Sequence, residues 1–158
     1  EEASIQMMLL AQPHAIHGLI FALESDLVYG QHFLTVQLPS GRKLFYPKPF
    51  LQENQFGKAA IHYYTVGQQT RKWEVTSTYG GTENIVQAIA RDCLAETLRR
   101  IEKKGLQVVF HVHDEVIIDA PLDVTVDEIC DLMAEPIPWA PGLILKGAGF
   151  ESNYYMKD

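Results

Sequence analysis

The hydrophobic positions of this 158-residue chain change their period along its length. In residues 4–28 apolar side chains recur at mostly helical spacing and are interrupted at Pro13, which predicts two short helices. Apolar and polar residues alternate farther on, which predicts strands. The strands expected from this alternation are 33–38, 43–46, 59–66 and 73–76, with an irregular stretch at 47–57.

The helical period returns over residues 84–104 and predicts a long helix that ends at Gly105. Its expected apolar stripe comprises Val86, Ala90, Leu94, Leu98 and Ile101, widened by Ile85, Ile89 and Cys93. A capping box at 125–128 opens another helix that ends near Met133. Residues 143–146 predict a final strand.

Two apolar runs meet at a His-Asp-Glu tip within residues 108–119 and predict a β-hairpin. By alternation, one face of its first strand carries Val108, Phe110 and Val112, and the other face carries Val109 and His111. The turn would hold Asp114 and Glu115 rigidly side by side, as a Mg²⁺ site requires. The alternative is an ordinary solvated acidic turn, because Asp and His are common turn residues.

The order of these elements favours an α+β fold, with an antiparallel sheet covered on one face by helices. The length fits one domain. The sequence has no apolar run of membrane-spanning length and no basic leader after Glu1 and Glu2, so a soluble, intracellular protein without membrane contact is expected. Cys93 and Cys130 match no metal-binding spacing and are expected to be reduced.

Charge is unevenly distributed, although the net charge is −7. Between Leu27 and Lys72 the only acid is Glu53. The basic residues of that stretch are Arg42, Lys43, Lys48, Lys58, Arg71 and Lys72, interleaved with phenylalanines and tyrosines. Basic residues among aromatics are typical of a nucleic-acid surface, and the alternative is a solvated β-rich surface with a few lysines.

Three blocks together resemble the C-terminal end of A-family DNA polymerases, the bacterial polymerase I family, in its phage or prophage branch. They are the Val-His-Asp-Glu run at 112–115 behind a long helix that opens at 83–92, the Leu-Pro-Ser-Gly-Arg block at 38–47, and the ending at 149–155. The resemblance spans roughly residues 33–158. It implies the palm portion of a polymerase, whose antiparallel sheet presents carboxylates to two Mg²⁺ ions.

The resemblance also implies roles for the hairpin residues. Asp114 matches the second essential metal-binding aspartate, Glu115 its secondary acidic neighbour, and His113 the histidine against the primer terminus. The implied partners are primer–template DNA and a dNTP. His111, on the other face, is expected to be structural.

Contacts to DNA are expected in two places. A family glutamine that reads the minor groove aligns with Glu83 at the start of the long helix, with Asn84 and Gln87 on neighbouring turns. The expected phosphate contacts are Lys72, Arg71, Arg42 and Lys58.

Other parts of the family pattern do not occur in the sequence. The first metal-binding aspartate and the fingers helix that holds the triphosphate are missing. We therefore expect residues 1–30 to be a helical lead-in that follows the fingers, and residues 31–158 to be palm. We expect this fragment to be inactive alone, and its parent to act in the cytoplasm of a bacterial host.

Two other functions compete with this interpretation. A zinc hydrolase would use His111, His113 and Asp114, with His62 as a further candidate ligand, although the spacing leaves the third ligand unspecified. A non-catalytic DNA-binding module would bind DNA in a salt-dependent way through Lys72 and Arg42, whatever stands at position 114. The sequence does not define an oligomeric state.

Overall fold

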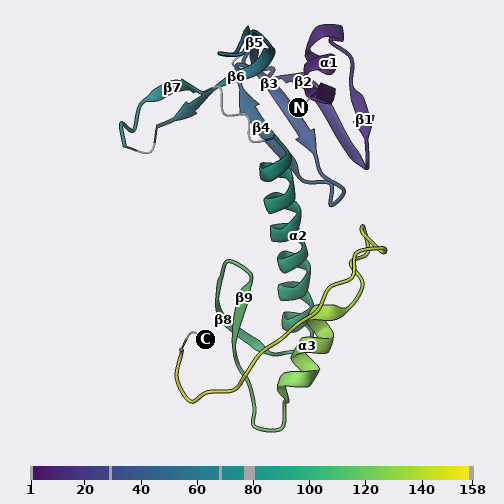
Figure 1. Cartoon of the computed structure of the whole chain (residues 1–158). Coiled ribbons are helices and arrows are strands. Elements are labelled where there is room, and N and C mark those ends of the chain that lie inside the picture. Colours follow the sequence, from purple (N-terminus) through teal and green to yellow (C-terminus); the bar gives the residue numbers. More distant parts are fainter. Residues whose placement is uncertain (1, 29, 68, 77–80, 157–158) are drawn as a thin grey trace. The chain divides into compact units, whose positions relative to one another are not determined.

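The computed structural model describes residues 2–28, 30–67, 69–76 and 81–156. It confirms an α+β fold with antiparallel sheets. Contacts divide the chain into two compact units, Glu1–Val86 and Gln87–Asp158, which are described separately (Figure 1). The domain boundary expected after residue 30 concerns the parent protein and stays a prediction.

Among its described residues, the first unit contains one short helix, the start of a longer helix and two antiparallel sheets. Its elements are α1 (Glu2–Leu10), β1 (His14–Ile16), β2 (Leu19–Ser25), β3 (His32–Gln37), β4 (Lys43–Pro47), β5 (Phe50–Glu53), β6 (Ala59–Val66) and β7 (Trp73–Thr76). The sheet orders are β1-β2-β3-β4 and β5-β6-β7. The strands predicted by alternation are confirmed, whereas β5 lies in the stretch that was expected to be irregular.

The second helix expected within residues 4–28 is wrong, because β1 and β2 form a hairpin there. His17 and Gly18 connect the two strands and both have positive φ, +50° and +77°. A two-residue turn with this backbone matches the twist of paired strands. The helical lead-in is therefore limited to α1.

The core of this unit lies on one face of the β1–β4 sheet. Phe21, Leu34, Val36 and Tyr46 share that face and are buried. Helix α1 packs against β1 and β2, and β4 contacts β6. The ring of Tyr46 meets that of Tyr63 edge to face at 5.0 Å, which joins the two sheets.

The second unit is built on most of α2 (Gly81–Lys103), together with β8 (Gln107–Val112), β9 (Glu115–Asp119) and α3 (Val126–Ala134). The predicted long helix is confirmed, but part of its expected apolar stripe is wrong. Val86 and Ala90 are exposed, and the buried line continues through Thr97 instead. Residues at i, i+4 and i+8 share a face, so Cys93, Thr97 and Ile101 form the inward row.

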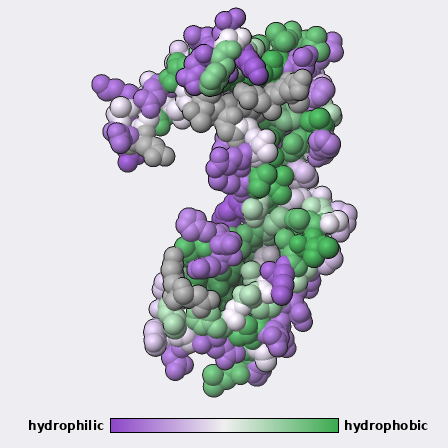
Figure 2. All heavy atoms as spheres, in the orientation of Figure 1, coloured by the Kyte–Doolittle hydropathy of each residue, from purple (hydrophilic) through white to green (hydrophobic). Residues whose placement is uncertain are grey.

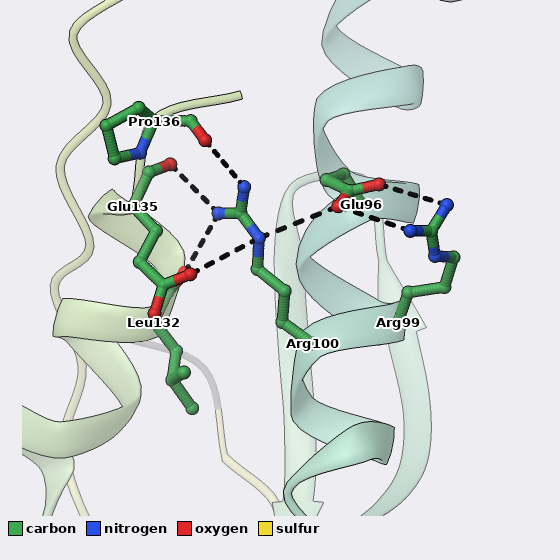
Figure 3. A network of polar contacts seen from close by, with 6 residues as sticks. All are labelled: Glu96, Arg99, Arg100, Leu132, Glu135 and Pro136. Atoms are coloured by element: carbon green, nitrogen blue, oxygen red, sulfur yellow. Dashed lines mark hydrogen bonds and ion pairs between the residues drawn. The ribbon is translucent and has the colours of Figure 1, made fainter. Parts of the chain in front are cut away.

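Helix α3 begins with the predicted capping box, in which the Thr125 side chain accepts from the backbone N–H of Glu128. Its C-terminal end is held by Arg100 of α2, which donates to the carbonyls of Glu135 and Pro136 at 2.9 and 2.7 Å (Figure 3). These bonds satisfy carbonyl groups that have no partner within a helix.

The strand predicted at residues 143–146 is wrong, since this segment pairs with no strand among the described residues. It leads to Gly147, which lies so close to α3 that an added Cβ would stand 2.8 Å from Cα of Cys130. Cys93 and Cys130 are both free thiols, as expected, and burial raises the pKa of the Cys93 thiol. Within the described parts of the chain, no helix combines the length and apolar character needed to cross a bilayer.

Candidate functional site

Strands β8 and β9 form the predicted hairpin, with one change in register. Val109 is an extra residue in β8, so that Val108 pairs with Ile118 while Phe110 pairs with Ile117. The expected shared face of Val108, Phe110 and Val112 is therefore wrong. Val108 lies on the face of His111, and the opposite face carries Phe110 and Val112.

His113 and Asp114 form the two-residue turn, and Glu115 begins β9 opposite Val112. His113 adopts a left-handed backbone with φ of +51°. A residue other than glycine pays about 1–2 kcal/mol for this conformation, because its Cβ crowds the backbone. The paired strands hold the turn in place, and all three side chains are exposed to solvent.

Each face of the hairpin has a neighbour from the same unit. On one face, Nη2 of Arg91 in α2 lies 3.4 Å from Nε2 of His111, within hydrogen-bonding distance. On the other face, the ring of Tyr155 packs edge to face on Phe110 with centroids 5.0 Å apart. Arg91 was missed by sequence reasoning, because a charged residue on the polar side of a helix is normally only solvated.

The tip offers two adjacent carboxylates, on Asp114 and Glu115. Mg²⁺ is commonly bound by one or two carboxylates with waters and substrate phosphates, so these residues fit part of such a site. Among the described residues, no three His, Cys, Asp or Glu side chains converge in a way that could hold a metal ion. Any further His, Cys, Asp or Glu ligand would therefore come from outside the described residues.

The zinc interpretation gains no support from the position of His62. This residue belongs to the first unit, where its ring is buried and stacked on Phe50 at 5.3 Å. Its Nδ1 lies 3.3 Å from the carbonyl oxygen of Ala60. His62 is thus part of the core packing around β5 and β6.

The predicted groove-reading residues lie in the first two turns of α2. Glu83 and Gln87 are exposed. Asn84 is half-buried and donates from Nδ2 to the hydroxyl of Tyr46 at 3.4 Å. Burial raises the pKa of that hydroxyl above the usual range of tyrosine. The amide of Asn84 is therefore directed into the first unit.

The predicted phosphate contacts all lie at turns of the first unit and are exposed. Arg42 is in the β3–β4 turn, Lys58 precedes β6, and Arg71 and Lys72 connect β6 to β7. Of the remaining basic residues between Leu27 and Lys72, Lys43 pairs with Glu24 at 2.6 Å, and Lys48 lies over the ring of Tyr64.

The chain is similar over its whole length to a known phage protein. The chain is 45% identical over 164 residues to a DNA polymerase of Bacillus phage SP02. The match covers 100% of this chain and 24% of that polymerase, so the chain spans about a quarter of the length of its relative. No protein-family model matches the chain. No solved structure matches it either.

Proposed function

We propose that this chain is the palm portion of an A-family DNA polymerase, which transfers a nucleotidyl group from a dNTP to a primer 3′-hydroxyl. The similarity to a phage DNA polymerase along the whole chain is the observation that carries the proposal. The exposed Asp114–Glu115 tip on a tightly connected hairpin supports it. That relative gives no support to a zinc hydrolase or to a non-catalytic module.

In this proposal Asp114 and Glu115 hold Mg²⁺, two ions being bound in the complete enzyme. The metal supplies Lewis-acid activation of the 3′-hydroxyl and neutralises charge on the leaving pyrophosphate. The chain's own part is to keep the carboxylates fixed: the turn sets their direction and the paired strands limit their motion. His113, in the same turn, contacts the primer end.

The surrounding residues would orient the DNA. Glu83 and Gln87 would approach the minor groove, and the exposed cations at the turns of the first unit would contact phosphates. The amide of Asn84 would have to leave Tyr46 in order to reach a base, so we rank it below its two neighbours. The site of action would be the cytoplasm of a bacterial host.

The test is primer extension by a longer protein that includes the upstream coding sequence, with Mg²⁺ present. Asp114→Asn should lower the extension rate at least about a hundredfold, since metal-dependent stabilisation of the transition state amounts to several kcal/mol. Its melting temperature should stay unchanged because the side chain is exposed.

Asp119→Asn is the matched control, because Asp119 is an exposed carboxylate at the other end of β9. This variant should extend primers like the wild type. If Asp114→Asn were fully active, or if Asp119→Asn were equally impaired, the assignment of Asp114 would be wrong.

A further inference from the structure

Strand β7 and the outer half of β6 form an arm that extends away from the β1–β4 sheet of the same unit (Figure 1). Alternation places Tyr64, Val66, Trp73 and Val75 on one face of this arm, with Val66 opposite Trp73 and Tyr64 opposite Val75. Trp73 is 66% exposed, Val66 47% and Val75 46%. A tryptophan this exposed on a strand pair contributes little to a core, so its surface is available to a partner.

Cations lie near both ends of this arm. At its base, Nζ of Lys48 lies 5.4 Å from the centroid of the Tyr64 ring. At its tip, Arg71 and Lys72 are exposed in the turn, which is closed by a hydrogen bond from Gly67 N–H to the carbonyl of Lys72 at 2.9 Å. Figure 2 shows hydrophilic residues gathered at the outer end of the arm.

No carboxylate of β6 or β7 lies on the face with Trp73. Glu74 is the single carboxylate in the sequence from 59 to 76. It pairs with Thr65 on the opposite face, and its side chain lies against Gly67. The face with Trp73 is therefore aromatic and apolar, and cations lie near both ends of the arm.

We propose that this face of the β6–β7 arm binds single-stranded DNA, with an unpaired base stacked on Trp73 and backbone phosphates held by Lys48, Arg71 and Lys72. Stacking needs a base whose flat face is open, and a duplex covers those faces except at its ends. An aromatic face with cations near both ends of its arm, and with no carboxylate of β6 or β7 on it, fits a polyanion better than it fits an apolar protein segment. The inference rests on the proposed function, in which the unpaired template strand supplies this ligand.

The test uses the 158-residue chain in a Trp139→Phe background, which leaves Trp73 as the only fluorescent tryptophan. A twelve-nucleotide oligo(dT), added without dNTP or metal ion, should quench the fluorescence of Trp73. Its affinity should fall as the salt concentration rises. In an otherwise wild-type chain, with affinity followed by the anisotropy of labelled oligo(dT), Trp73→Leu should weaken binding at least about fivefold, because stacking is lost. Trp73→Phe, which keeps an aromatic face, should weaken it less.

The phosphate contacts of Arg71 and Lys72 are tested separately, by the salt dependence of the affinity for oligo(dT). Replacing both Arg71 and Lys72 by Gln should reduce the slope of log affinity against log salt by about 1.4, at about 0.7 for each phosphate contact to a single strand. Arg99→Gln is the matched control, because it removes an exposed arginine of the second unit, and it should leave the slope unchanged.

Three results would overturn the inference: absence of quenching, equal affinity for a duplex of the same length, or equal affinity of Trp73→Leu and wild type. Equal affinity of Trp73→Leu and wild type would mean that the arm binds DNA through its charges alone, without stacking. None of them bears on primer extension by Asp114→Asn, so failure of this inference and failure of the proposed function remain distinguishable.

Discussion

At the scale of single residues, the sheet face that points away from the core of the first unit holds an ion pair. Oε1 of Glu24 lies 2.6 Å from Nζ of Lys43, and it also accepts from the hydroxyl of Thr35 at 3.1 Å. The hydrogen bond from Lys43 lowers the pKa of Glu24 below its usual range. Both charged side chains are partly exposed, so solvent screens the pair.

We expect Glu24→Gln to destabilise the first unit by less than about 1 kcal/mol at neutral pH. Because the pKa of Glu24 is lower in the folded state, its contribution is present above the unfolded pKa of about 4.3. It is lost as the pH falls through the lower folded pKa. Urea unfolding of the wild type and of Glu24→Gln between pH 2 and 7 should therefore show the two curves of unfolding free energy merging in acid.

Glu53→Gln is the control for this pair, since it removes an exposed carboxylate of β5. Its curve should follow that of the wild type more closely than the Glu24→Gln curve does. A difference for Glu24→Gln that persisted below pH 3 would show that the variant acts through packing rather than charge.

At the scale of elements, Arg100 connects α2 to the C-terminal end of α3. Its guanidinium also lies 3.7 Å from a carboxylate oxygen of Glu96 and 3.5 Å from one of Glu135 (Figure 3). The side chain is only 12% exposed, so these contacts are shielded from water more than those of a surface pair. The planar guanidinium can reach several carbonyl groups at once, which a single ammonium cannot.

Arg100→Lys should therefore lower the free energy of unfolding of the second unit by about 1.5–3 kcal/mol, the value of charge-assisted hydrogen bonds. Chemical denaturation followed by circular dichroism measures this loss. Arg99→Lys, on the same turn but 63% exposed and paired only with Glu96 among the described contacts, should cost less than about 1 kcal/mol. Equal losses for the two variants would contradict the role of Arg100.

The sequence predicted elements well where local signals agreed and poorly where they competed. Helix α2 was predicted from a long helical period of apolar residues, and helix α3 from a capping box. Both helices are confirmed. In β1 and β2 most positions are apolar, so a helical period fits by coincidence, and the decisive signal was Gly18 in a two-residue turn. The 143–146 strand failed because a strand needs a partner, and no local pattern can supply one.

The candidate site was predictable from the sequence only where local signals determine its structure. The hairpin and its tip residues followed from alternation and a polar turn, and the structure has them. The bulge at Val109 could not be predicted, because no glycine or proline in the sequence indicates its position. Arg91 depends on a contact with His111 across 20 positions of sequence, which periodicity within one helix does not encode.

At the scale of the whole molecule, the tip carboxylates would form only part of a metal site. The described residues bring no third His, Cys, Asp or Glu to Asp114 and Glu115, and the chain spans about a quarter of the length of its phage relative. In the proposed polymerase the remaining ligands come from another protein segment and from nucleotide phosphates. Metal affinity should therefore depend on parts that this chain does not contribute.

We accordingly expect calorimetric titration of the 158-residue chain to show Mn²⁺ and Zn²⁺ affinities of about 1 mM or weaker, as for sites with few ligand charges. Mn²⁺ binding by the longer protein with primer–template and nucleotide should be tighter, and Asp114→Asn should remove that gain. Stoichiometric Zn²⁺ binding by the chain alone, lost on His111→Ala, would contradict this expectation. It would point instead to a metal centre built around His111 and His113, because tight zinc sites are complete within the protein that holds them.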